Sequence, residues 1–349
     1  MKLNKTYIIA SVIALVCVIA AVCLELISHS LLSGLLHQTA ANRYMGEAGT
    51  DYKQFSVFFG VNNRLTTDEV KSVEDSINQN LKDNSVNAES EDSKLWYDAW
   101  SVDIGEVTAG GVKDSEVICL ATCVGGDFFK IHSMRLMDGS YIEPDDLMDD
   151  RVVIDTVAAW SLMGSSEISN MEITIDNVPY LIAGVVETDK PSDSVYGSAG
   201  RIWMPYPPSA ANGSSGGTVS CYEAVLPNPV RNFAKNCMDK AFGMKSGKQI
   251  LNNTDRGLFA SRFEHLRNLR QMVAVEDGIA YPWWENAARL RDYTVAQLFG
   301  VEILLLIFPV FCLCAGIWIL YKFLSALISK KIEENKRRYR TIEKDPYAT

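Results

Sequence analysis

The residues able to do chemistry are few, and none of their spacings completes a known catalytic motif. The run Gly243–Gln249 is similar to a nucleotide-binding phosphate loop, but it is one residue short between its glycines and ends in Gln where that loop has Ser or Thr. No histidine forms a zincin motif or adjoins a Ser-centred nucleophile elbow. The histidines are His29, His37, His132 and His265. We therefore expect no catalytic residue and no cofactor, and we interpret the histidines as surface or packing residues.

Two further groups of residues are candidates for metal binding or disulfide formation. An acidic cluster could attract Ca²⁺, but it lacks the spaced ligands and central glycine of an EF-hand loop, so a solvated loop is favoured and no metal site is predicted. The cluster comprises Glu143, Asp145, Asp146, Asp149 and Asp150. The cysteines outside the apolar segments are Cys119, Cys123, Cys221 and Cys237. Cys119 and Cys123 would lie about 13 Å apart on one strand, too far for a bridge. Buried free thiols and one long-range disulfide both stay open.

Two uncharged segments are long enough to cross a bilayer. Tyr7–Leu24 has 18 residues and Ile303–Tyr321 has 19, and the shorter one rises about 27 Å as a helix, close to the thickness of a hydrocarbon core. Basic residues precede the first segment and follow the second: Lys2, Lys5, Lys330, Lys331, Lys336, Arg337, Arg338, Arg340 and Lys344. The positive-inside rule therefore predicts cytoplasmic termini and an external region over residues 30–296.

The predicted external region is acidic. It contains 23 Lys and Arg against 37 Asp and Glu, a net charge of −14 against −10 for the whole chain, which argues against a nucleic-acid partner and fits a solvated domain. We expect a plasma-membrane protein with two spans that contact lipid. A cleaved signal peptide or a lipoprotein at Cys23 is disfavoured, because the apolar run is long and Val22 stands where a lipoprotein motif has a small residue.

Three residues of the spans are candidates for a role in or beside the membrane. Glu25 and Glu302 lie near the outer ends of the two spans, where a charge is costly unless it faces protein, water or headgroups. Each is a candidate contact with a partner subunit, and ordinary interfacial placement is the favoured alternative. Pro309 removes a helical hydrogen bond, so it predicts a kink and is a candidate hinge.

The elements that position these residues follow an α+β pattern. Thr66–Glu69 is a capping box that opens a helix, and the run Gln54–Val61 before it is strand-like. The apolar face of this helix is formed by Val70, Val73, Ile77 and Leu81. Further β-rich runs cover 95–107 and 116–124, and the pair Gly125–Gly126 marks a boundary.

The predicted organisation has two transmembrane helices with stalk extensions that flank an external domain. The parts are 1–6, cytoplasmic N-terminus; 7–28, first transmembrane helix; 29–53, stalk helix; 54–124, first part of an α+β subdomain; 125–206, inserted β-rich subdomain; 207–218, flexible linker; 219–257, second part of the α+β subdomain; 258–298, stalk helix region; 299–323, second transmembrane helix; and 324–349, basic cytoplasmic tail.

Four runs in the external region carry a family resemblance. They are Val124–Gly139, Arg151–Thr156 with Leu162–Gly164, Met171–Glu187 and Ile202–Tyr206. Their order of glycine-aromatic turn, strand with helix, hairpin and Pro-ended strand resembles the periplasmic core domain of MacB-like ABC transporter permeases, a family that includes FtsX-like permeases. The resemblance covers residues 1–325 and implies a porter-like α+β subdomain with the β-rich insertion.

The resemblance also implies how such a protein works. It implies a cytoplasmic partner ATPase, and motion transmitted through the stalks to the external domain. Family members usually have four spans and this chain shows two, so we expect a half-permease or accessory subunit that pairs with a second permease chain. The implied cargo is a peptide, a lipoprotein or a small amphipathic molecule. The alternative is a stand-alone membrane-anchored extracytoplasmic binding or sensory protein.

Overall fold

The computed structural model describes residues 5–48, 50–87, 94–111, 116–144, 146, 149–188, 199–206, 219–243, 245–272 and 278–344. The predicted linker at 207–218 and Asp145 of the acidic cluster lie outside the described residues. The chain forms two compact units, one from Met1–Ser30 with Val295–Thr349 and the other from Leu31–Thr294.

The first unit contains two helices that are long and apolar enough to cross a membrane. They belong to α1 (Lys5–Ser33) and α9 (Trp283–Lys344), which include both predicted apolar segments. Large apolar side chains are exposed along both helices, among them Ile9, Val16 and Phe311. Water disfavours such continuous apolar surface, whereas lipid accommodates it. This unit is therefore the membrane part of the chain, and α9 continues through Pro309 as one helix.

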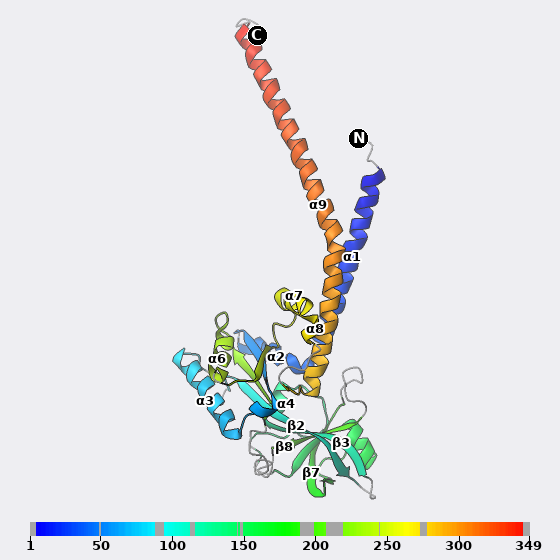
Figure 1. The fold of residues 1–349 in the computed structure, drawn as a ribbon, viewed down its shortest axis with the longest axis vertical. Helices are drawn as coiled ribbons and strands as arrows, with labels where there is room; N and C mark the ends of the chain where they lie inside the picture. Colours follow the sequence, from blue (N-terminus) through cyan, green and yellow to red (C-terminus); the bar gives the residue numbers. More distant parts are fainter. Residues whose placement is uncertain are drawn as a thin grey trace. The chain divides into compact units, whose positions relative to one another are not determined.

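The second unit is organised around one ten-stranded sheet (Figure 1). The strand order is β10-β1-β9-β2-β3-β8-β5-β7-β4, and β6 pairs with β2 and β7. The strands are β1 (Tyr52–Phe59), β2 (Tyr97–Gly110), β3 (Glu116–Gly126), β4 (Leu136–Gly139), β5 (Arg151–Asp155), β6 (Glu172–Ile175), β7 (Val178–Val186), β8 (Gly200–Pro205), β9 (Cys221–Pro227) and β10 (Lys248–Asn252). Most pairs are antiparallel, but β3 with β8 and β5 with β7 are parallel. The predicted mixture of helices and strands is confirmed.

Strand β2 joins the two halves of the sheet. Its residues Tyr97–Ser101 pair with β9, and Ala109 and Gly110 pair with β6. The register with β3 shifts at Gly105, whose φ of +96° a glycine adopts at little cost. One bulged strand therefore serves both halves, and the segment 125–206 does not form a sheet of its own. The expected β-rich insertion is correspondingly part of the same compact unit as its surroundings.

Helices α3 (Thr67–Asp83) and α6 (Phe233–Phe242) cover one face of the β1–β9 half. The predicted capping box is confirmed: the Glu69 N–H donates to Thr66 Oγ1 at 3.2 Å, and the Thr66 N–H donates to the Glu69 carboxylate at 2.8 Å. The four predicted apolar residues of α3 are all buried, against α6 and the strands.

The opposite face of the same strands carries a second apolar cluster. Because side chains alternate along a strand, Phe58 joins this cluster while Val57 and Phe59 face α3 and α6. The cluster includes residues of α2 (Ala40–Ala48), of α4 (Phe128–Ile131), and Trp283 and Trp284 at the start of α9. The remaining elements are α5 (Thr156–Met163), α7 (Phe259–Arg267), α8 (Leu269–Met272) and the 3₁₀ turns η1 (Leu36–Gln38) and η2 (Val61–Asn63).

The predicted stalk helix over 29–53 is wrong in its extent. Helix α1 ends at Ser33, and η1 and α2 follow before β1 begins at Tyr52. The break falls at Gly34, where an added Cβ would lie 2.6 Å from Nη1 of Arg291. Arg291 also donates to the carbonyl oxygen of Leu31 at 3.0 Å. The end of α1 therefore lies against a side chain of α9 that is distant in the sequence, a contact that the local sequence does not reveal.

Candidate functional site

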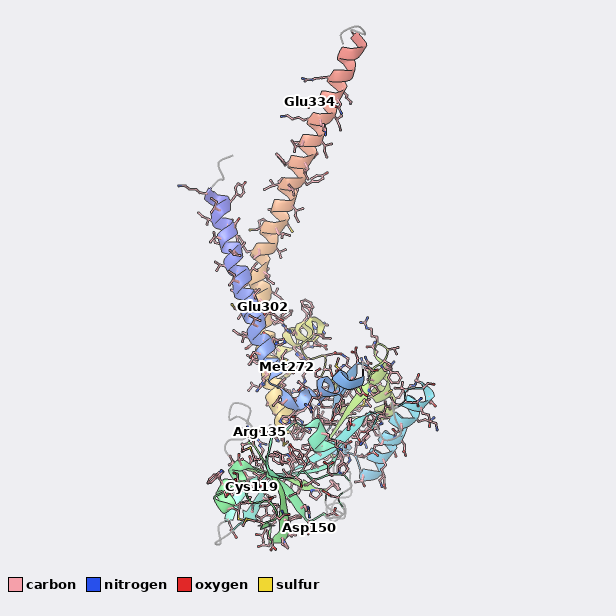
Figure 2. The ribbon with its side chains drawn as sticks, turned by 180° about the vertical axis from the view of Figure 1, so that it is seen from behind. Cys119, Arg135, Asp150, Met272, Glu302 and Glu334 are labelled. Atoms are coloured by element: carbon pink, nitrogen blue, oxygen red, sulfur yellow. The ribbon has the colours of Figure 1, made fainter. Side chains whose placement is uncertain are left out.

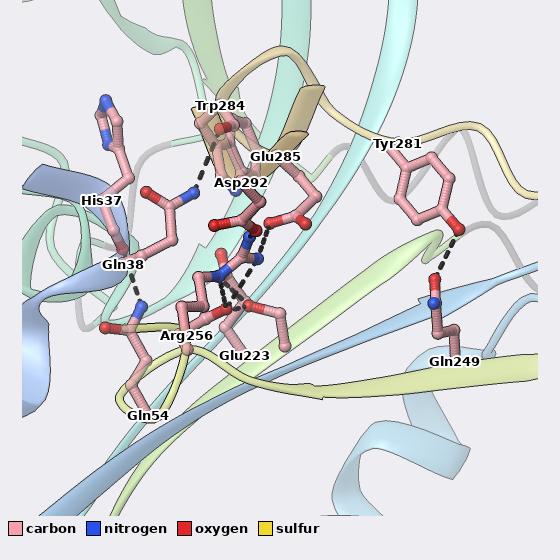
Figure 3. Close-up of polar contacts among 12 residues, drawn as sticks. His37, Gln38, Gln54, Glu223, Gln249, Arg256, Tyr281, Trp284, Glu285 and Asp292 are labelled. Carbon is pink, nitrogen blue, oxygen red and sulfur yellow. Dashed lines mark hydrogen bonds and ion pairs between the residues drawn. The ribbon is translucent and has the colours of Figure 1, made fainter. Parts of the chain in front are cut away.

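A buried arginine lies between two carboxylates of α9 (Figure 3). Arg256, in the loop after β10, places Nη2 2.5 Å from Glu285 Oε2 and Nη1 2.5 Å from Asp292 Oδ2. The two acids are two helical turns apart, so they share one face of α9. The side chains of Arg256, Glu285 and Asp292 are 8%, 1% and 4% exposed, and the contact fixes the start of α9 to the domain.

The charges of this cluster shift its proton equilibria. Burial alone lowers the pKa of Arg256, but the adjacent Glu285 and Asp292 outweigh burial and hold the pKa above its ordinary value. Burial raises the pKa of Glu285, and Arg256 opposes that rise. Removal of Arg256 would therefore leave both buried acids without their hydrogen-bonded cation, and the weaker effect of Arg289 on the pKa of Glu285 would remain.

A chain of hydrogen bonds continues from Arg256 into the sheet. Asn253 Oδ1 accepts from Nε and Nη2 of Arg256 at 3.1 and 3.0 Å, and Asn253 Nδ2 donates to Ser56 Oγ at 2.7 Å. Ser56 Oγ donates to Glu223 Oε1 at 2.6 Å. Ser56 and Glu223 face each other as a cross-strand pair of β1 and β9, so the hydrogen bonds cross from β1 to β9, the second and third strands from the β10 edge.

Two histidines extend the chain beyond β9. His132 Nε2 lies 2.6 Å from Glu223 Oε2, and His132 Nδ1 lies 3.1 Å from His37 Nδ1. Both rings are buried. Burial lowers the pKa of His132, although Glu223 opposes it, so the neutral ring is favoured. In the tautomer we infer, His132 Nε2–H donates to Glu223 and His132 Nδ1 accepts from His37.

The far end of the chain returns to α9. His37 lies in η1, three residues after Gly34, and its ring packs edge-on against Trp283 at 5.0 Å between centroids. Gln38 Nε2 donates to the Trp284 carbonyl at 3.1 Å, and Gln54 Nε2 donates to the His37 carbonyl at 2.7 Å. The polar chain therefore ties the segment after α1, the start of α9 and strands β1 and β9 together (Figure 3).

This arrangement suits mechanical coupling better than catalysis. Ser56, Glu223 and His132 are residue types found in hydrolase triads, but Ser56 donates to the carboxylate and makes no bond to His132 in the described contacts. Ser56 is also 1% exposed, so a substrate has no access to its hydroxyl. Hydrogen bonds that link buried residues into one network instead hold those residues in a fixed arrangement.

A cavity of about 710 Å³ lies beside the arginine cluster. Its wall is formed by β10, α6, α7, α8 and the first turns of α9, and it includes Arg256, Glu285 and Asp292. Its size falls in the range of roughly 300–1,000 Å³ typical of small-ligand pockets.

The candidate residues in the membrane are placed differently from one another. Glu25 is exposed on α1, whereas Glu302 is 6% exposed on α9 (Figure 2). The structure does not bring Glu25, Glu302 or Pro309 into the polar chain. Their roles as partner contacts and hinge stay predictions.

The other sequence candidates have structural roles. The four cysteines outside the spans are buried free thiols (Cys119 is labelled in Figure 2), and burial raises the pKa of Cys119 to about 11 and of Cys123 to about 12. Gly243–Gln249 connects the end of α6 to β10, whereas a phosphate loop leads from a strand into a helix. The described part of the chain holds no group of three or more His, Cys, Asp or Glu that could bind a metal.

Sequence reasoning missed the whole polar chain. Of its members the sequence singles out only His37 and His132, which it predicts to be surface or packing residues. Their packing role is confirmed, but their partners are not close in the sequence: His37 and His132 are 95 residues apart, and His132 and Glu223 are 91 apart. No spacing in one sequence reports such contacts.

Residues 7–231 match the family model of the MacB-like periplasmic core domain. Two curated relatives are similar over shorter stretches. The macrolide export ATP-binding/permease protein MacB of Pasteurella multocida is 31% identical over 85 residues, 24% of this chain and 13% of that protein. The protein of the same name from Chromobacterium violaceum is 33% identical over 91 residues, 25% of this chain and 14% of that protein. The matches thus span about one seventh of the relatives' length.

Solved structures give more distant likenesses. The periplasmic region of MacB from Actinobacillus actinomycetemcomitans is 15% identical, with a TM-score of 0.39 over 58% of this chain and 89% of that one. The extracellular domain of the noncanonic ABC-type transporter YknZ from Gram-positive bacteria is 14% identical, with a TM-score of 0.37 over 57% of this chain and 100% of that one. Scores this low add no argument to the family match.

Proposed function

Because the chain belongs to the family of proteins with a MacB-like periplasmic core domain, we propose that it is a membrane subunit of an ABC transporter system. In this role it couples a cytoplasmic partner ATPase to motion of its extracytoplasmic domain, for export or mechanotransmission. Both termini lie in the cytoplasm. A second permease chain is a further partner, and the cargo is a peptide, a lipoprotein or a small amphipathic molecule.

The observation that carries the proposal is the buried polar chain from Asp292 to His37. Helix α9 is one uninterrupted helix that starts inside the external unit and continues through the apolar segment to Lys344. A helix transmits displacement along its axis because its backbone hydrogen bonds keep the rise per residue constant. Displacement of α9 moves Glu285 and Asp292, and the hydrogen bonds of Arg256, Asn253 and Ser56 carry this displacement to strand β1.

Nucleotide-dependent hydrogen exchange tests this coupling. The full chain is purified from native membranes in nanodiscs with its co-purifying proteins, and amide exchange is compared without nucleotide and with ATP and vanadate. We expect an ATPase in the preparation and altered exchange in β1, β9 and the 253–256 loop. Arg256→Met is expected to abolish the nucleotide effect, while Arg135→Met, a change at an exposed ion pair, preserves it. Absence of an ATPase from the preparation, or amide exchange rates that are the same with and without nucleotide, contradicts the proposal.

Glu25 is the better candidate for contact with the second permease chain. It is exposed on α1, whereas Glu302 is buried within this chain. A carboxylate at this depth is stabilised by a polar partner. We expect Glu25→Leu to lower the yield of a co-purifying permease and the exposed-site change Glu334→Leu to leave it unchanged.

The cavity beside Arg256 favours a second candidate function, a stand-alone membrane-anchored binding or sensory protein. Its size suits a small ligand. In that case exchange in the external unit responds to an added ligand and not to nucleotide, and no ATPase accompanies the chain. The same preparation distinguishes the two functions.

A further inference from the structure

Within the described part of the chain, the outer edge of β10 pairs with no other strand. β10 is the terminal strand of the sheet and pairs with β1 alone. The Asn253 N–H donates to the Gln54 carbonyl, and the Gly60 N–H donates to the Gly247 carbonyl. Because backbone groups of an antiparallel strand alternate in direction, odd-numbered residues of β10 face β1 and even-numbered ones face away. The N–H and C=O groups of Ile250 and Asn252 therefore point outward, and among the described contacts they have no partner.

This edge lines the cavity beside the arginine cluster. Gln249, Ile250, Leu251 and Asn252 follow one another along its wall. A free strand edge inside a cavity can accept an extended peptide as an additional strand, through main-chain hydrogen bonds. The five residues of β10 offer about 17 Å for such pairing.

The same cavity contains hydrogen-bond acceptors that nothing in the described chain satisfies. Asn252 Oδ1, Glu285 Oε1 and Asp292 Oδ1 are buried and without a partner. The Glu285 residue is 0% exposed and Asp292 is 4% exposed. Each carboxylate gives its other oxygen to Arg256, so the two acids share one hydrogen-bonded cation, and Arg289 in the same cavity wall supplies a further positive charge that acts on Glu285. Buried acceptors of this kind favour a charged donor such as a guanidinium or an ammonium group.

We propose that the cavity binds an extended peptide segment with a basic side chain. The peptide backbone pairs with Ile250 and Asn252 as an added strand. Its basic side chain donates to the unpartnered oxygens of Glu285 and Asp292. The inference goes beyond the coupling proposed above and does not depend on a partner ATPase.

Peptide selection on the purified full chain in nanodiscs tests the site. The probe is an equimolar pool of acetylated pentapeptides with a central arginine and randomised flanks, and retention is quantified by mass spectrometry. Two matched pools serve as controls: one replaces arginine with neutral, nearly isosteric citrulline, and the other carries N-methylated amides that cannot donate. We expect the arginine pool to be retained at least ten-fold better than either control pool.

One substitution separates strand pairing from charge recognition. Ile250→Pro removes the outward N–H without removing a ladder hydrogen bond, since proline is tolerated on edge strands, and Ile250→Thr is its control. We expect Ile250→Pro to lose at least ten-fold in retention and Ile250→Thr to keep it. No retention of any pool, equal retention of arginine and citrulline pools, or equal retention of methylated and unmethylated pools each overturns the proposal. The pool comparisons leave the protein unchanged, so misfolding of a variant cannot mimic them.

Discussion

Replacement of Arg256 by methionine tests whether the polar chain is integral to the fold. Arg256→Met keeps the bulk of the side chain but removes the cation that, among the described residues, forms ion pairs with both Glu285 and Asp292. Breaking a buried ion pair by removing one partner costs about 3–5 kcal/mol, because the other charge stays buried and uncompensated. Since about 1.4 kcal/mol is a factor of ten, we expect the ratio of folded to unfolded protein to fall by at least roughly 10²-fold.

The measurement is urea unfolding of the full chain in detergent, followed by tryptophan fluorescence. Trp283 and Trp284 are buried beside the polar chain, so their fluorescence reports its exposure to solvent on unfolding. The matched control is Arg135→Met, whose ion pair with Glu187 spans 3.6 Å with side chains 73% and 54% exposed. Exposed pairs contribute about 0–1 kcal/mol, so the control should unfold close to the wild type.

Acid should reduce the defect of Arg256→Met. Burial raises the pKa of Glu285 even in the wild type, and loss of Arg256 raises it further. The folded variant therefore binds a proton at a pH where the unfolded chain does not, so its stability increases as pH falls. Adding Glu285→Gln and Asp292→Asn should restore most of the loss at neutral pH. A loss below about 1 kcal/mol, similar to that of the exposed pair, would refute the reasoning.

Three further predictions concern a histidine, a helix cap and the topology. Burial lowers the pKa of His132, so below about pH 6.5 the unfolded chain binds a proton that the folded chain excludes, and this residue should remove about 1.4 kcal/mol of stability per pH unit as pH falls. Urea titrations of the wild type and of His132→Gln between pH 5 and 7.5 check this slope. The difference between the two stability curves removes the contribution of other titrating groups, such as Asp98, whose pKa burial raises to about 7. Parallel stability curves would contradict the prediction. Thr66→Ala removes the capping box of α3 and should cost about 0.5–2 kcal/mol, measured by the same unfolding assay, whereas Thr67→Ala should cost little. For topology, Trp160→Cys introduces a thiol at an exposed site of the external unit, and a membrane-impermeant maleimide should label it in intact spheroplasts. The thiol of Glu334→Cys should react only after permeabilisation. The reverse labelling pattern would mean that the orientation is inverted.

Local features of this protein were predictable from the sequence. An apolar segment needs only its own residues to qualify as a span, and both segments lie in helices of the expected kind. The α3 helix likewise depends on contacts within four residues, between Thr66 and Glu69 and along one apolar face. The family resemblance was carried by runs of consecutive residues, and the family model matches them.

The extent of the stalk and the unity of the sheet required the tertiary structure. The helix from Lys5 stops at Ser33, and the next residue, Gly34, lies beside Arg291, which is distant in the sequence. The segment 125–206 joins the main sheet because β2 is long and bulged at Gly105, which allows it to pair on both sides. Neither the end of this helix nor the pairing of segment 125–206 with the main sheet follows from local propensity or residue spacing.

The candidate site was decided by tertiary structure alone. Ser56 is hydrogen-bonded to Glu223, which lies 167 residues away in the sequence, and Asn253 is hydrogen-bonded to Ser56, which lies 197 residues away. A serine or an asparagine in a sequence carries no mark of burial, and whether an arginine is solvated or bound between two acids depends on which elements pack around it. Local sequence patterns therefore determined which segments are apolar helices and which are strands. The packing of those segments determined which polar groups are buried and form hydrogen bonds with one another.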